Sequence, residues 1–403
     1  MPTIAQGTRK ITVLKKQTGI GVPATGSGGQ ILRRRTSVFN APRETFESDE
    51  IVSHHQSTGI GYGMKSANGK IEGLLSAGTY ATPLAALLER LFAAVTAITG
   101  VSLTTAGTGP YTLTRAAGSW LTDGVKIGDV IRTSAAGNAN NINKNLWVVG
   151  VTALVLTVIV LNGTTLTAEG PIAAVTITVI GKKTFAPMTG HTSEYFTVEE
   201  WYADLARSEL FTDMRFSQAA IGLPASGNST ISLDLVGLDR SLSAVQQLTT
   251  PTAETLTGVM PSVNGLLYLN GVQQSVVTGV QFTIGNNAAN VGAVVGSKNS
   301  PDVARGRIRV SGSFTAMFDS VTIQSIYDGE SAVALQTVVA ADKTATSDFM
   351  SWVLGRIKLT GDAPDDGEKG IVRTYPFTAE INGSGGAALA YDQTILSVQD
   401  SAA

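Results

Sequence analysis

The stretch NLWVVGVTALVLTVIVLNGTTLTA, residues 145–168, decides between a membrane protein and a β protein. It carries no charged residue, as a membrane span would require. Its apolar part, from Leu146 to Leu161, is nevertheless shorter than the ~20 residues that a spanning helix needs. It is rich in Val, Leu and Thr and ends on Asn162-Gly163, a strong signal for a hairpin turn. We therefore predict paired β-strands here and no membrane span.

The composition of the whole chain is that of a globular protein with several domains. Its 403 residues are too many for one compact unit, and 43% of them are hydrophobic, enough to build cores. The net charge of −2 argues against a dedicated nucleic-acid binder, which normally carries a basic surplus. The chain has no cysteine and no apolar core of signal-peptide length at its start, which suits synthesis in a reducing compartment.

Strand signals dominate, because short runs of Val, Ile, Thr and Phe alternate with turns rich in Gly, Asn and Ser. The best helical pattern is TPLAALLERLFAAV, Thr82–Val95. Thr82 can cap this helix and Pro83 suits its first turn, while the apolar residues recur at i, i+3, i+4 and i+7. The segment Ser347–Leu354 reads equally well as a short helix or a strand.

The distribution of charge and a faint internal repeat predict the domain organisation. Charged residues become sparser over residues 97–183, which we interpret as a small all-β domain inserted into a larger unit. That larger unit comprises residues 1–96 and 184–245, and residues 246–403 form a second one. The repeat consists of three segment pairs in a common order: ANGKIEG (67–73) with ARGRIRVSG (304–312), FSQAAIGLPASG (216–227) with WVLGRIKLTGDAPDDG (352–367), and STISLDLVG (229–237) with PFTAEING (376–383).

The predicted fold class is therefore mainly β. It consists of two β-sandwich or barrel units, each with a flanking helix, plus the small inserted all-β domain. Each segment pair alone is weak evidence, and their shared order supports the duplication.

The chain is poor in residues that carry catalysis. It has three histidines, and the adjacent His54 and His55 would point to opposite faces of a strand, so they cannot readily bind one metal together. His191 stands alone in the sequence. The glycine cluster Thr58–Met64 is typical of a hairpin tip, and GDAPDDGEKG (361–370) lacks the ligand spacing of a calcium loop. We expect no cofactor, no metal and no enzymatic activity.

The stretch RETFESDEIV, residues 43–52, concentrates carboxylates in a chain that is only 15% charged. In an extended strand, alternate side chains share one face, and neither face of this stretch is cleanly apolar. Just before it, LRRR (32–35) places three bases together, which we interpret as a candidate subunit interface. The candidate residues are Glu44, Glu47, Asp49 and Glu50 for the acidic stretch and Arg33, Arg34 and Arg35 for the basic one.

Several segments resemble the major tail tube proteins of long, flexible-tailed bacteriophages (siphophages). The resemblance lies in QTGIGVPATGSGGQILRRRTSVF, in RETFESDEIVSHHQSTG, and in GKIEGLLSAGTY leading into the apolar helix. It continues in EYFTVEEWYADLARSELFTDMRFSQAAIGLPASG and returns in SPDVARGRIRVSGSFTAMFDS and GRIKLTGDAPDDGEKGIVRTYPFTAE. It covers most of the chain outside the inserted domain, which is similar to accessory β-modules of such proteins.

The resemblance implies a structural virion protein, made in the host cytoplasm, that polymerises as stacked rings into the phage tail tube. Genomic DNA would pass through the lumen without specific binding, and other tail proteins would meet the tube at its ends. The usual ring is a hexamer. The suspected duplication favours a trimeric ring with pseudo-sixfold symmetry, and six chains per ring is the alternative.

On this interpretation the acidic stretch has three possible roles. It could line the channel and repel the phosphates of DNA, pair with bases of a neighbouring subunit or ring, or form a solvated surface. An adhesion or decoration protein of a virion or cell surface is the alternative function for the whole chain.

Overall fold

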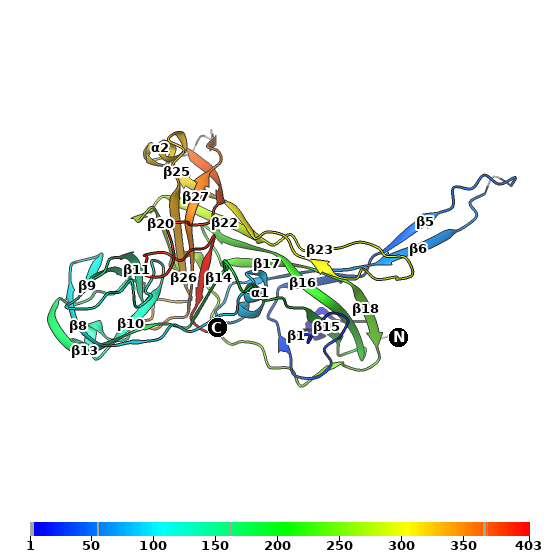
Figure 1. The fold of residues 1–403 in the computed structure, drawn as a ribbon, viewed down its shortest axis with the longest axis horizontal. Coiled ribbons are helices and arrows are strands. Elements are labelled where there is room, and N and C mark those ends of the chain that lie inside the picture. Colours follow the sequence, from blue (N-terminus) through cyan, green and yellow to red (C-terminus); the bar gives the residue numbers. More distant parts are fainter. Residues whose placement is uncertain (1–3, 55, 162, 366–367, 369) are drawn as a thin grey trace.

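The structure is a computed structural model that describes residues 4–54, 56–161, 163–365, 368 and 370–403. An 18-stranded sheet forms the main body, with a six-stranded barrel at one end and a long hairpin projecting from the other (Figure 1). Two short helices, α1 (Ala81–Leu87) and α2 (Thr322–Asp328), accompany the sheet. The predicted mainly β fold class is confirmed.

Eight strands of the large sheet follow one another in an unbroken antiparallel run. Along much of these strands buried and partly accessible residues alternate, as they do throughout β17, because successive side chains point to opposite faces. One face is apolar and packs on the core, and the other is polar. In order of pairing, the run consists of β4 (Thr36–Asn40), β7 (Ala67–Leu74), β17 (Thr230–Gly237), β16 (Arg207–Pro224), β22 (Val277–Gly285), β25 (Arg309–Met317), β29 (Val372–Ala379) and β27 (Phe349–Leu359).

The run divides into two halves with the same order of elements. In the first half, β4 is followed by the hairpin β5 (Arg43–Glu47) and β6 (Ile60–Lys65), then by β7 and α1. In the second, β22 is followed by the hairpin β23 (Ala289–Asn290) and β24 (Val303–Ala304), then by β25 and α2.

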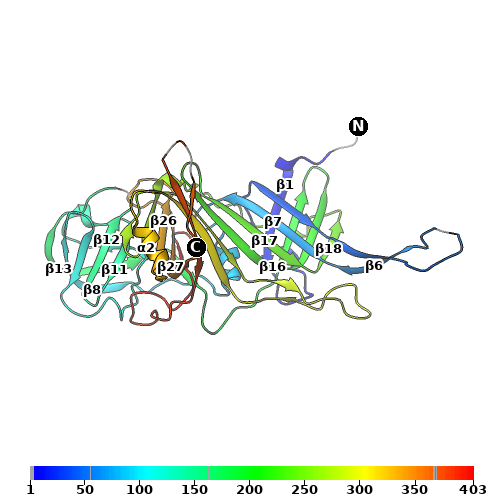
Figure 2. The same ribbon diagram turned by 90° about the horizontal axis from the view of Figure 1, so that it is seen from above.

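Both halves carry the same outer strands. β1 (Lys10–Lys16) pairs with β15 (Phe196–Tyr202), which pairs with β16, and β20 (Gly265–Leu269) pairs with β26 (Val333–Ala340), which pairs with β27. Figure 2 shows β7, β17 and β16 side by side from above. The remaining strands outside the barrel are β2 (Gly26–Ser27), β3 (Gln30–Ile31), β14 (Lys182–Phe185), β18 (Asp239–Ser243), β19 (Leu248–Thr249), β21 (Val272–Gln273), β28 (Ala363–Asp365) and β30 (Ser397–Asp400).

One core serves both halves. It joins the apolar sides of the strands to α1, whose residues Leu84 and Leu87 are fully buried. The helix is shorter than the predicted Thr82–Val95. It ends because Glu89 adopts a left-handed φ of 58° and the chain then turns so that Ala93 exchanges backbone hydrogen bonds with Lys183. The segment Ser347–Leu354 is not helical, and its residues from Phe349 onward begin β27.

The closed barrel comprises β8 (Ile98–Ala106), β9 (Tyr111–Arg115), β10 (Val130–Ser134), β11 (Leu146–Val151), β12 (Val155–Val160) and β13 (Glu169–Val179). The predicted hairpin is present as β11 and β12, but its turn lies at residues 152–154. Asn162 of the predicted turn lies outside the described residues. In the part of the chain that the structure describes, no helix has the length and apolarity to cross a membrane.

The barrel lies within the predicted inserted domain, 97–183, and packs on the second half of the sheet. Trp147 is fully buried at this junction, where its ring stands edge-on to Tyr268 at 5.2 Å between centroids. Its indole Nε1–H donates to Gly128 O and to Ser351 Oγ, each at 3.2 Å. The boundaries of the domains and their independence stay predictions.

Candidate functional site

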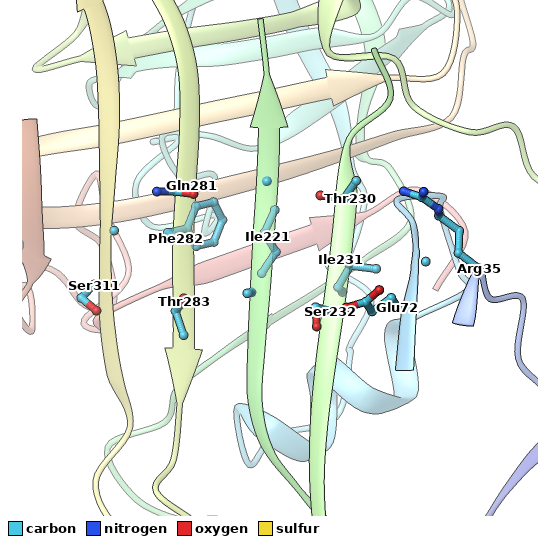
Figure 3. Close-up of a pocket in the computed structure, with 14 residues that line it drawn as sticks. Arg35, Glu72, Ile221, Thr230, Ile231, Ser232, Gln281, Phe282, Thr283 and Ser311 are labelled. Carbon is cyan, nitrogen blue, oxygen red and sulfur yellow. The ribbon is translucent and has the colours of Figure 1, made fainter. Parts of the chain in front are cut away.

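The polar face of the eight-strand run is a candidate site. A hollow of about 520 Å³ lies over β7, β17, β16, β22 and β25, on the side of the sheet away from the core (Figure 3). Its lining combines hydroxyl, amide and backbone groups with three buried apolar side chains and with two charged residues, Arg35 and Glu72. Its lining residues are Arg35, Glu72, Gly73, Ala220, Ile221, Gly222, Thr230, Ile231, Ser232, Gln281, Phe282, Thr283, Ser311 and Gly312.

Two ion pairs lie near the edges of this face, while Arg309 of β25 and Lys358 of β27, which share the face, form no salt bridge among the described residues. Lys70 Nζ lies 2.7 Å from Glu72 Oε1, and Lys70 stands opposite Asp234 in the β7–β17 register. The hydrogen bond with Glu72 raises the pKa of Lys70, and the same bond lowers the pKa of Glu72. Burial raises the pKa of Asp234. At the far edge, Arg356 Nε lies 2.9 Å from Glu380 Oε2. Two cations of this face are therefore held by carboxylates.

The polar face was missed at the sequence level, although a signal for it was present. The stretch STISLDLVG alternates Ser232 and Asp234 with buried leucines, the pattern of a strand with one polar face. What the sequence does not display is that eight such strands lie side by side and merge their polar faces.

An open edge lies at each end of the run, on β4 at one end and at the other on β28, which follows β27 along the same side of β29. Within the described residues, β4 pairs only with β7, and β28 pairs only with β29. An open edge presents backbone donors and acceptors that can pair with another chain. The run therefore offers one pairing edge at each end.

The acidic stretch lies on the projecting hairpin and not on the polar face. Glu44 and Glu47 belong to β5, all of whose residues are exposed, while Asp49 and Glu50 lie beyond the strand. The second strand of the hairpin, β6, begins at Ile60. The hairpin β5–β6 extends well beyond the rest of the sheet (Figures 1 and 2).

The projecting hairpin also exposes large apolar side chains. Phe46, Ile60 and Tyr62 are 57–66% exposed. Arg43 lies over the ring of Tyr62 at 4.7 Å. A surface that combines apolar side chains with a polar rim is typical of an interaction site.

The three bases before β4 occupy different environments. Arg33 donates to the carbonyls of Thr257 at 2.6 Å and Thr255 at 3.2 Å, and Arg34 donates to Lys10 O. Both therefore tie segments of their own chain together. Arg35 is exposed and lies at the rim of the hollow near Glu72 (Figure 3). The role of the three residues at a subunit interface stays a prediction.

The two described histidines, His54 and His191, lie in separate environments. His54 is exposed, His55 lies outside the described residues, and His191 Nδ1 lies 2.9 Å from Glu89 Oε2. Glu89 also contacts Arg305 at 3.1 Å, so its carboxylate is held between two bases. Among the described residues, no cluster of three or more His, Asp or Glu side chains could hold a metal ion.

The chain is mainly β and has a broad polar sheet face, open edges and a projecting hairpin with apolar and acidic side chains. These features are typical of a structural protein that assembles with other copies. Comparison with protein families matches residues 7–379 to the phage tail tube protein family. The chain belongs to this family, which places it in the tail of a virion and implies oligomeric assembly into a tube. No curated protein sequence matches the chain.

Proposed function

We propose that three copies of this chain close into a ring, that rings stack into the tail tube of a flexible-tailed phage, and that DNA leaves the virion through the bore. The observation that carries the proposal is the repeated order of β4–β7–β17–β16 and β22–β25–β29–β27. Each half supplies one four-stranded unit with its own hairpin and helix. Three copies of eight strands make a barrel of 24 strands in six equivalent units, so a duplicated chain needs only three copies.

The polar face of the run is the side that we assign to the channel. Helix α1 and the core cover the opposite face, so closing the sheet with the polar face inward leaves the apolar side packed. Hydroxyl groups and cations that are paired with carboxylates hold DNA less strongly than unpaired Lys and Arg contacts to phosphate, so the neutral groups and ion pairs of this face favour sliding more than Arg309 and Lys358 oppose it. Lys70 and Arg356 are both paired with carboxylates on this face.

We assign the acidic stretch to contacts between rings. Glu44 and Glu47 project with the hairpin away from the sheet, and the exposed Phe46, Ile60 and Tyr62 need a partner surface to cover them. A neighbouring ring is the surface that a projecting arm reaches in a stacked tube. The projection of the hairpin therefore favours contacts between rings, and not lining of the channel, as the role of the carboxylates.

Electron microscopy of the purified protein tests the proposal. The wild-type chain should form rings and stacked cylinders of constant width, with six density units per ring contributed by three chains. A variant in which a short Gly-Ser turn replaces residues 44–64 should still form rings but should not stack them. A wild-type chain that stays monomeric at high concentration would contradict the tube function, and stacked tubes from the shortened variant would contradict the role of the hairpin.

A further inference from the structure

The pairing between the two halves of one chain provides a template for the joint between neighbouring protomers. The last strand of the first half, β16, pairs with the first strand of the second half, β22, so that Gly222 lies opposite Gln281 and Ala220 opposite Thr283. In the proposed ring, the last strand of the second half must meet the first strand of the next protomer's first half. The strands with open edges available for that contact are β4 and β28, which continues β27 along β29.

A packing feature that β4 and β22 share shows which residues of the two strands are equivalent. Phe39 on β4 lies against Gly69 of β7, where an added Cβ would approach its ring to 2.1 Å. Phe282 on β22 lies opposite Gly312 of β25, where an added Cβ would approach Phe282 Cα to 2.8 Å. Phe39 therefore corresponds to Phe282, and one residue earlier Val38 corresponds to Gln281.

The residues of β28 that are equivalent to residues of β16 are found in the same way, through the neighbouring strands β29 and β17. Ser232 lies opposite Glu72, three residues after Gly69, and Thr374 lies opposite Thr315, three residues after Gly312. Ser232 and Thr374 are therefore equivalent. Their partners on the outer strands are Ala220 and Ala363, so Ala363 corresponds to Ala220 and Asp365 corresponds to Gly222.

We propose that β28 of one protomer pairs with β4 of the next in the register of the internal β16–β22 joint, with Asp365 opposite Val38 and with Glu368, beyond the end of β28, close to Arg35. This inference rests on the proposed ring and adds the partner edges and their register. Arg35 comes directly before β4 and Glu368 comes three residues after the end of β28, so this register brings both to the same end of the joint.

The charges fit this register. Arg35 and Glu368 are both exposed in the single chain, and Asp365 adds a second exposed carboxylate beside the joint. Arg33 and Arg34 donate to carbonyls of their own chain, which leaves Arg35 as the base at the outer edge. In the internal joint the equivalents of Arg35 and Glu368 are Thr278 and Ala225, which carry no charge. The charge pair thus distinguishes the joint between chains from the joint within one chain.

Cysteine cross-linking tests the register directly, because the chain contains no cysteine of its own. Two in-register variants, Val38→Cys/Asp365→Cys and Asn40→Cys/Ala363→Cys, should form covalent links between chains in assembled tubes. The crossed variants, Val38→Cys/Ala363→Cys and Asn40→Cys/Asp365→Cys, are offset by two residues and serve as matched controls. We expect the in-register pairs to link at least about tenfold faster, because directly opposite Cβ atoms lie about 5 Å apart and diagonal ones about 7–8 Å. The ladder on a denaturing gel should end at three chains.

Charge reversal tests the electrostatic part. Arg35→Glu and Glu368→Arg should each slow ring formation at least about fivefold at low salt, and the double variant should restore it to within about twofold. Faster linking of the crossed pairs, or a double variant as slow as the single ones, would overturn the proposed joint. Normal tubes without any link between β4 and β28 would overturn it while leaving the tube function intact. A wild-type chain that forms no rings would instead contradict the proposed function.

Discussion

The buried carboxyl group of Asp400 gives a prediction that can be worked through to a magnitude. Asp400 ends β30, and its side chain is fully buried. Its two oxygens accept hydrogen bonds from the backbone N–H of Gly78 at 2.9 Å, and Oδ1 accepts another from Ala402 at 2.9 Å. Burial outweighs these bonds and raises the pKa of Asp400 to about 6.

The sign of the effect follows from the direction of the shift. Because the pKa of Asp400 lies above its ordinary value of 3.8, the folded protein binds this proton more tightly than the unfolded chain does. Its stabilising contribution is complete below pH 3.8 and is lost as the pH rises through about 6. At about 1.4 kcal/mol for each pH unit, the loss amounts to about 3 kcal/mol.

The variant Asp400→Asn should remove this pH dependence. One amide oxygen can still accept from both Gly78 and Ala402, and no buried charge remains at neutral pH. In urea unfolding followed by tryptophan fluorescence, we expect the variant to exceed the wild type by up to about 3 kcal/mol at pH 8 and by little at pH 4. Asp365→Asn, an exposed control, should show no such difference. Equal stability changes at pH 4 and pH 8 would refute the reasoning.

Further predictions concern packing and charge. Gly312→Ala places a Cβ 2.3 Å from the carbonyl oxygen of Gln281 and should cost about 1–3 kcal/mol in thermal unfolding, whereas Gly370→Ala, with open space around it, should be neutral. Trp147→Ala should cost about 3–5 kcal/mol and make the barrel junction sensitive to limited proteolysis, and an unchanged digestion pattern would contradict the docking. Lys183→Met removes the base that contacts the buried Asp129 and should destabilise the chain by about 3–5 kcal/mol at pH 7, with the loss shrinking in acid; a loss independent of pH would argue against the ion pair.

Local patterns predicted the strands better than the ends of elements. The apolar run Leu146–Leu161 was correctly assigned to paired strands, because its length and composition exclude the alternative. The helix from Thr82 was predicted too long because the periodic leucines continue past its end. The φ angle of Glu89 and the pairing of Ala93 with Lys183 end the helix, and the pairing involves a strand about 90 residues further along the chain.

The candidate residues show the same limit. The composition of the acidic stretch indicated an unusual surface, and its lack of an apolar face agrees with a hairpin whose first strand is fully exposed. The pattern could not place that hairpin outside the sheet, because a free strand and an edge strand share the same alternation. Among the three bases, only the tertiary contacts distinguish Arg35 from Arg33 and Arg34.

The central claim is that the eight-strand run closes with other copies into a barrel whose polar face surrounds the bore. A cryo-electron microscopy map of the assembled tube tests it most directly. The account predicts three chains per ring and a continuous wall in which Thr283, Ser311 and the Lys70–Glu72 pair face the channel. A map in which these residues face outward, or in which neighbouring chains meet without joining their sheets, would contradict it.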